Sequence, residues 1–309
     1  MISLIIQQLI NGLGESVRYA LIAVGFTIFF GVLNVIVFCV GDIATVGVFI
    51  ILSLYLLMGT FHVLSGLPFV LFAAAVILLG SLLTGLFGIL VERVSVKPFR
   101  KSNPVIPLIA TVSLGIVIRE SISVFYPRGR DPQQFPDFLP SGMFAIGDIS
   151  VTYRDLSIIC IALLLITVLF LMVNHTKFGR SIRAIAQNRD AAVMMGINVS
   201  RIHIYTFFLV GFVMGLSGFL TGSYLGSVRY DMGLREGVIG FSAAVVGGLG
   251  NIYGAILGGL LFGIIEAMTM AFVPMGGAYK DIACFIAIIC FMIFKPSGMI
   301  GEKILKEKV

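Results

Sequence analysis

Long apolar runs set the strictest limit on how this chain can fold. A run of about 17–25 apolar residues is long enough to cross the bilayer core as a helix. We expect such spans near residues 17–38, 43–61, 67–91, 105–125, 156–174, 203–226, 254–273 and 281–297. A shorter glycine-rich run near 237–250 crosses fully or dips partway. The predicted fold is all-α: one polytopic transmembrane helical bundle, about 8–9 spans, in a single domain over residues 1–309.

The composition supports lipid as the solvent. Apolar residues make up 59% of the chain, charged residues only 12%, and the mean hydropathy is +1.09. A soluble domain carries about 25% charged residues, so this sequence is not typical of a soluble protein. The formal net charge of +6 does not indicate a nucleic-acid partner, because the cations gather in a few segments between the spans.

Three basic segments give the expected orientation. They hold thirteen of the 21 lysines and arginines: Arg93, Lys97, Arg100, Lys101; Lys177, Arg180, Arg183, Arg189, Arg201; and Lys295, Lys303, Lys306, Lys308. The positive-inside rule assigns all three to the cytoplasm. This predicts an outside N-terminus, a cytoplasmic C-terminus, a cytoplasmic loop at about 175–202 and an irregular, proline-rich extracytoplasmic loop at about 126–155. It also requires the 237–250 run to cross. "LIIQQLINGL" is either an interfacial helix or an extension of the first span.

The glycines recur at helical spacing inside the apolar runs. They are Gly211, Gly215, Gly218 and Gly222 in one run and Gly250, Gly254, Gly258 and Gly263 in another. Small residues four apart let helices approach closely in lipid, so we expect helix packing there. A dinucleotide loop is excluded because Tyr253 takes the place of the third glycine, and the sequence contains no P-loop motif.

The sequence gives no support for an enzyme. The four cysteines lie in apolar runs without Cys-x-x-Cys spacing, which favours buried thiols. "GLSG" resembles the motif of intramembrane serine proteases, but no histidine follows Ser217 to serve as its base. The histidines and carboxylates show no metal-ligand spacing, so we expect no catalytic and no metal site.

The loop from Lys177 to Ile202 is amphipathic, with Ile182, Ile185, Ala186, Ala192, Val193 and Ile197 at helical spacing. A basic amphipathic helix can also lie on lipid headgroups. Within the loop, "DAAVMMG" (190–196) resembles the E-A-A-x-x-x-G loop of ABC importer permeases, with Asp in place of Glu. "GRSIRAIAQNRDAAVMMGINVSRI", "SAAVVGGLGNIYGAILGGLLFGIIEA", "ALIAVGFTIFFGVLNVI" and "VERVSVKPFR" together resemble the permeases of branched-chain amino-acid ABC importers, of the LivH type.

The resemblance covers nearly the whole chain and implies the ABC importer permease fold, in a prokaryotic inner membrane. It implies two cytoplasmic ATP-binding subunits, a second, related permease or a second copy, and an extracytoplasmic solute-binding protein, with ATP bound only by the partners. It assigns coupling to Arg189, Asp190, Ala191, Ala192 and Gly196. Arg93, Lys97 and Arg100 are either a secondary cytoplasmic contact or a topological anchor.

The substrate stays open between branched-chain amino acids and related solutes such as urea or short amides. "VFCVGD" (37–42) departs from the more polar motif that many members carry there. Polar groups inside lipid are costly and often functional, so Asp42 and Glu266 are candidates for the translocation pathway. The alternatives are a helix cap for Asp42 and a bond to a neighbouring helix for Glu266. Arg229, Asp231, Arg235 and Glu236 are expected as an external cluster, either solvated or receiving the binding protein. A stand-alone secondary carrier is the other functional reading.

Overall fold

The computed structural model describes residues 2–60, 69–100, 102–140, 142–146, 149–295 and 298–300, and it is built almost entirely of helices. The α-helices are α1 Ile2–Leu33, α2 Val40–Thr60, α3 Phe69–Val91, α4 Val105–Phe125, α5 Tyr153–His175, α6 Lys177–Gln187, α7 Arg189–Met194, α8 Val199–Leu225, α9 Met232–Gly247, α10 Ile252–Phe272 and α11 Gly276–Phe294. A π-helical turn, η1 Glu92–Val96, and a 3₁₀ turn, η2 Lys97–Phe99, extend α3. The strands are β1 Gln133–Gln134, β2 Met143–Ile146, β3 Ile149–Thr152 and β4 Ser227–Val228.

Eight of these helices are long and apolar enough to cross a membrane, which confirms the all-α, multi-pass expectation. Among the expected spans α9 is the exception, because its 16 residues reach only about 24 Å at 1.5 Å per residue, against about 30 Å of hydrocarbon. Gly247 at the end of α9 packs on Gly254 near the start of α10. α9 therefore runs antiparallel to α10 and returns the chain to the end of the bundle where α8 begins.

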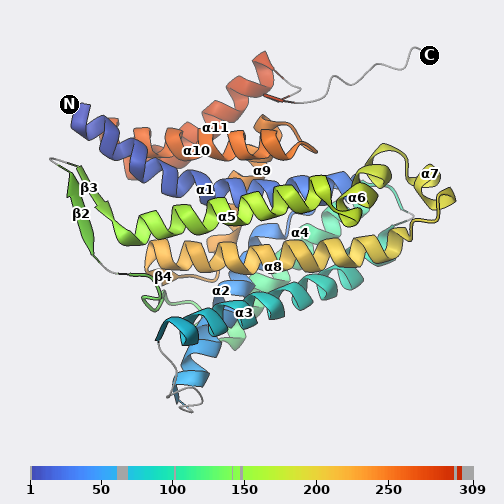
Figure 1. Ribbon diagram of the computed structural model, residues 1–309, viewed down its shortest axis with the longest axis horizontal. Helices are drawn as coiled ribbons and strands as arrows, with labels where there is room; N and C mark the ends of the chain where they lie inside the picture. The colour runs from blue at the N-terminus through green and yellow to red at the C-terminus, as the bar shows by residue number, and fades with distance from the viewer. Residues whose placement is uncertain are drawn as a thin grey trace.

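α1 forms the centre of the bundle, and α10 packs antiparallel along it. The contacts run from Gly12 against Ala267 to Gly263 against Ser16. Figure 1 places the N-terminus at one end of the bundle and α6 with α7 at the other. "LIIQQLINGL" belongs to the continuous helix α1, so the extension is correct and the interfacial helix is wrong.

Residues 34–39 break the helical path between α1 and α2. The expected span 17–38 is wrong at this end, because α1 stops at Leu33. Phe38 N–H donates to Thr111 Oγ1 of α4 at 3.2 Å, and Gly41 packs against α9 at Gly233 and Gly237. Irregular backbone at membrane depth is tolerated when protein surrounds it. The start of α2 thus lies inside the bundle beside the start of α9.

Most of the predicted packing glycines lie at close helix contacts. A Cβ at Gly211 would stand 2.8 Å from the Thr84 carbonyl oxygen, and one at Gly215 would stand 2.9 Å from the Ser81 Cα, both on α3. Gly218 and Gly222 of α8 pack closely against α2. In α10, Gly254 and Gly258 pack against α9, and Gly263 packs against α1. The prediction for Gly250 is wrong. This residue precedes α10, has a φ of +92° and supplies the turn after α9.

The expected irregular loop at 126–155 is partly ordered into strands. β2 and β3 form an antiparallel hairpin with Met143 opposite Thr152, and β1 pairs with β4 after α8. The side-chain amide of Gln7 on α1 donates to the Ser150 carbonyl at 2.8 Å and accepts from the Ser150 N–H at 2.9 Å. The hairpin is therefore fixed to α1 at the bundle end opposite α6 and α7 (Figure 1).

Candidate functional site

Three helix caps divide the basic loop at 175–202 into separate helices. Thr176 Oγ1 accepts from Gly179 N–H at the start of α6, and Asn188 Oδ1 accepts from Ala191 N–H at 3.0 Å at the start of α7. Asn198 Oδ1 accepts from Arg201 N–H at the start of α8. Such side-chain caps satisfy N–H groups that a helix cannot pair internally. The loop expected to carry one short amphipathic helix therefore carries two.

A small apolar core holds α7 against α6 and α8. Ile185, Ala192 and Val199 form it, and Ala192 is only 3% exposed. Ile182 is also buried, whereas Ala186 and Val193 are exposed. The two alanines of the motif thus have different surroundings, since Ala192 faces this core and Ala191 is open to the surface.

Gly196 makes the turn that follows α7. Its φ of +82° lies in the left-handed region, which costs other residues more than glycine. Across this turn Ile197 N–H donates to the Ala192 carbonyl at 3.0 Å. This geometry is a common helix ending, and it directs the chain into α8.

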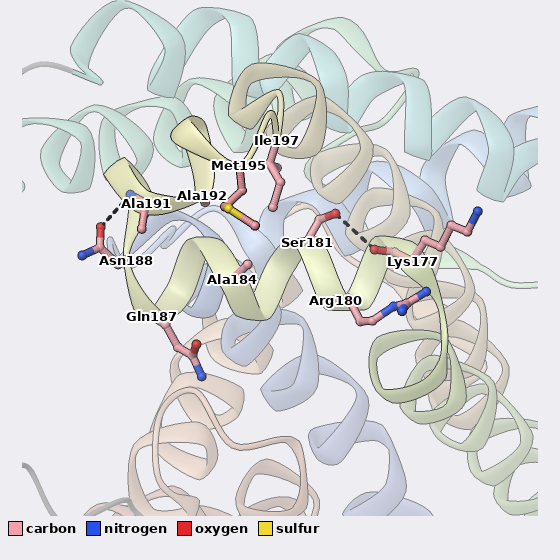
Figure 2. A pocket seen from close by; sticks show the side chains of 10 residues that line it. All are labelled: Lys177, Arg180, Ser181, Ala184, Gln187, Asn188, Ala191, Ala192, Met195 and Ile197. Atoms are coloured by element: carbon pink, nitrogen blue, oxygen red, sulfur yellow. Dashed lines mark hydrogen bonds between the residues drawn. The ribbon is translucent and has the colours of Figure 1, made fainter.

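A groove of about 480 Å³ runs between α6 and α7. Figure 2 shows its lining side chains, with Lys177 and Arg180 at one end and Asn188 at the other. Ala184, Ala191 and Ile197 make the floor apolar, and Met194 and Met195 are each 83% exposed beside it. The surface combines an apolar groove with one basic end and one amide end, a form suited to a protein partner.

The first basic segment, on the turns after α3, contacts the start of α8. Arg100 pairs with Glu92, which is fully buried, and donates to Ser200 Oγ at the start of α8 at 2.9 Å. Arg93 and Lys97 on η1 and η2 are exposed. Arg100 therefore has a structural role beside α8, and the other two cations are free to meet a partner; Lys101 lies outside the described residues.

A charge cluster lies inside the bundle, nearer the other end, and joins α1, α9, α10 and α11. Its members are Glu15, Arg18, Arg235, Glu236, Glu266, Lys280 and Asp281. Glu266 is fully buried and accepts from Tyr19 Oη, from Arg235 Nη2 at 2.9 Å and from Lys280 Nζ at 2.5 Å. Such complete pairing offsets the cost of a buried carboxylate.

The α1 side of the charge cluster is equally enclosed. Arg18 is 1% exposed, pairs with Glu15 and donates to Thr221 Oγ1 at 3.3 Å. Its guanidinium lies 4.3 Å from the Tyr224 ring centroid on α8, a cation–π distance. These contacts explain how α1 keeps two charges within a span.

The four residues of the expected external cluster line one cavity beside the start of α9. Arg229 and Asp231 form an exposed pair at 3.0 Å, but Arg235 and Glu236 belong to α9 and to the charge cluster. Sequence reading placed all four in a loop because α9 is short and begins with polar residues. Glu15 and Arg18 were missed as well, and their spacing of three within an apolar run was the available signal.

Asp42 and Glu266 lie in different ion pairs. Asp42 is in the first turn of α2, 5% exposed, with its Oδ1 3.5 Å from Arg119 Nε on α4. It pairs across helices instead of capping α2. Glu266 bonds three neighbouring helices, as the alternative role described.

The chain is similar to known proteins over nearly its whole length. Residues 8–292 match the family model described as the permease component of the branched-chain amino acid transport system. The chain is 32% identical to the high-affinity branched-chain amino acid transport system permease protein BraD of Pseudomonas aeruginosa, over 96% of both chains. It is 29% identical to LivH of Escherichia coli K12, again over 96% of both, and 26% identical to a probable LivH of Methanocaldococcus jannaschii, over 91% of this chain and 88% of that one. No solved structure matches.

Proposed function

This chain belongs to the family of permease components of branched-chain amino acid transport systems, and we propose that it forms the membrane path of an ATP-driven importer for leucine, isoleucine and valine. The observation that carries the proposal is full-length similarity to permeases named for these solutes. Related solutes such as urea or short amides are the alternative substrates, because the motif at 37–42 differs from the usual one.

We propose that energy reaches the chain through α6 and α7. Two cytoplasmic subunits bind ATP, and a surface of one of them docks into the groove lined by Ala184, Ala191 and Ile197. Arg189 and Asp190 flank the groove and fix the register, while Gly196 links α7 to α8. The small core around Ala192 makes α7 move together with α8, so a push on α7 is transmitted into the bundle.

A secondary contact with the ATP-binding subunit would use Arg93 and Lys97. Both are exposed on the turns after α3, while Arg100 ties those turns to α8. This arrangement supports a single docking surface formed by α6, α7 and the α3 extension, on the side that the positive-inside rule assigns to the cytoplasm. In this orientation the N-terminus lies on the extracytoplasmic side of a prokaryotic inner membrane, and the C-terminus lies in the cytoplasm.

The remaining partners follow from the same proposal. A second permease, related or identical, completes the path, and an extracytoplasmic solute-binding protein delivers the solute at the end that carries β2 and β3. Membrane lipid covers the exposed apolar faces of α5 and α11. Asp42 and Glu266 supply polar groups near the path; the contacts of Glu266 also support a role in holding α9, α10 and α11 together.

Reconstitution tests this function directly. The complex is purified through a tag on this chain and placed in proteoliposomes with ATP in one compartment. We expect ATP-binding subunits to co-purify and leucine uptake to require both ATP and the binding protein. A stand-alone carrier would instead transport leucine without either partner, and that result would overturn the proposal. Uptake of urea in place of leucine would select the alternative substrate.

A further inference from the structure

A cavity of about 290 Å³ lies at the end of α8, on the bundle end opposite α6 and α7. Its wall includes apolar Leu225 and Met232 together with Arg229, Asp231, Arg235 and Glu236. Pockets for drug-sized ligands have volumes of about 300–1,000 Å³. This cavity lies at the lower end of that range, so it suits a smaller solute. Both signs of charge meet an apolar surface here.

Glu236 is the unusual residue of this wall. It is 4% exposed, and its Oε2 has no hydrogen-bond donor among the described residues. Its Oε1 has only long ion pairs, 3.7 Å to Arg18 and 3.8 Å to Arg235. Buried carboxylate oxygens are normally hydrogen-bonded, so Glu236 is an acceptor available to a ligand in the cavity.

The charge balance of the charge cluster points to a cationic ligand group. The cluster contains four carboxylates, Glu15, Glu236, Glu266 and Asp281, but only three cationic side chains, Arg18, Arg235 and Lys280. With all groups ionised, one negative charge is left over. A bound ammonium group beside Glu236 neutralises it and supplies the missing donor.

The neighbouring rim suits a carboxylate. α9 begins at Met232 without a side-chain cap from Asp231, and a helix N-terminus carries a partial positive charge that favours anions. Arg229 stands at the rim with its side chain 55% exposed, paired with Asp231 at 3.0 Å. Its remaining N–H groups are free to bind a second carboxylate.

We propose that this cavity is a binding site for the zwitterion of an aliphatic amino acid. Glu236 accepts hydrogen bonds from the ammonium group, Arg229 binds the carboxylate, and Leu225 and Met232 contact the aliphatic tail. The site receives the solute at the end where α8 and α9 meet. This inference rests on the proposed function, since it names the residues that recognise the proposed solute class.

The test measures leucine uptake and ATP hydrolysis together, in proteoliposomes that contain the complete transporter and its binding protein. Glu236→Gln is expected to lower leucine uptake per ATP hydrolysed at least tenfold. Glu15→Gln is the matched control, because it also removes one carboxylate facing Arg18 but does not line the cavity. Because it removes the same unit of negative charge but leaves the acceptor beside the cavity, it is expected to lower the ratio clearly less than Glu236→Gln does.

A second variant, at the rim of the cavity, tests the site even if the Glu236→Gln protein fails to fold. Arg229→Gln changes an exposed side chain, and we expect it to raise the KM for leucine about tenfold with normal ATP hydrolysis. An unchanged KM, or an equal loss of coupling in Glu15→Gln and Glu236→Gln, overturns the site. Absence of leucine uptake by the wild type overturns the proposed function instead, so the two failures are distinguishable.

Discussion

Arg235 of α9 and Asp281 of α11 form a forked ion pair, in which Nε and Nη2 donate to the carboxylate over 2.8–3.2 Å. Arg235 Nη2 also donates to Glu266. One guanidinium thus connects α11 to both α9 and α10. Because α11 has few buried side chains, this pair is a principal polar attachment of the last helix.

Asp281→Asn is expected to weaken that attachment moderately. Both side chains are partly exposed, 35% for Arg235 and 42% for Asp281, so water compensates part of the loss, and about 1–2 kcal/mol is expected. Glu266→Gln should cost more, about 3 kcal/mol, because the fully buried carboxylate pairs with Tyr19, Arg235 and Lys280 at once. Thermal unfolding of the detergent-solubilised chain measures both. Equal melting temperatures for the two variants would contradict this ranking.

Gly263→Ala is expected to disrupt the packing of α1 on α10. A Cβ at this position would collide with the Ser16 backbone, and overpacking of a tight contact costs about 1–3 kcal/mol. Gly31→Ala is the matched control, since a Cβ there meets nothing within 4 Å. Size-exclusion profiles and melting curves should show a loss for Gly263→Ala alone. Alanine is the better helix former, so a similar loss at Gly31, where no clash is present, would contradict the packing explanation.

Ala191→Arg and Ala192→Leu are expected to fail in different ways. Ala191 lines the open groove, so arginine there should block docking and reduce co-purification of the ATP-binding subunit more than tenfold, with an unchanged melting temperature. Ala192 is buried in the core of α6, α7 and α8, so leucine there should lower the melting temperature itself. Normal co-purification with Ala191→Arg would place the docking surface elsewhere.

Arg100→Ala is expected to be the damaging change among the cations after α3. It leaves fully buried Glu92 without its partner, at a cost of about 3 kcal/mol. Lys97→Ala changes an exposed side chain and should alter stability by no more than about 0.5 kcal/mol. Lys97→Ala should instead reduce ATP-driven uptake if this surface meets the ATP-binding subunit. Chemical or thermal denaturation separates the two effects.

The sequence predicted best where an apolar run is continuous. The expected span 156–174 agrees closely with α5, Tyr153–His175, because no charge interrupts that run. The first span was expected to start at residue 17, just after Glu15, whereas α1 begins at Ile2 and pairs Glu15 with Arg18 inside the bundle. Residues 35–39 are apolar and continue the flanking apolar runs, so hydropathy could not separate them from a helix.

The two candidate sites differ in how far sequence could define them. The coupling loop is continuous, so its caps at Asn188 and Asn198 and the turn at Gly196 were accessible to local reasoning. The charge cluster is assembled from α1, α9, α10 and α11, and Glu15 is more than 260 residues from Asp281 along the chain. Glu266 was recognised beforehand because a lone carboxylate in a long apolar run is conspicuous, whereas Arg235 and Glu236 were expected in an external cluster.

Cross-linking from position 195 tests the central claim, that a separate ATP-binding subunit drives this chain through α7. Met195 is 83% exposed beside the groove, so a photoreactive residue there reaches whatever occupies the surface. In the complete transporter in intact cells, we expect a covalent adduct between this chain and the ATP-binding subunit. An adduct with the extracytoplasmic solute-binding protein, or labelling of Met195→Cys by an impermeant thiol reagent added outside, would contradict the account.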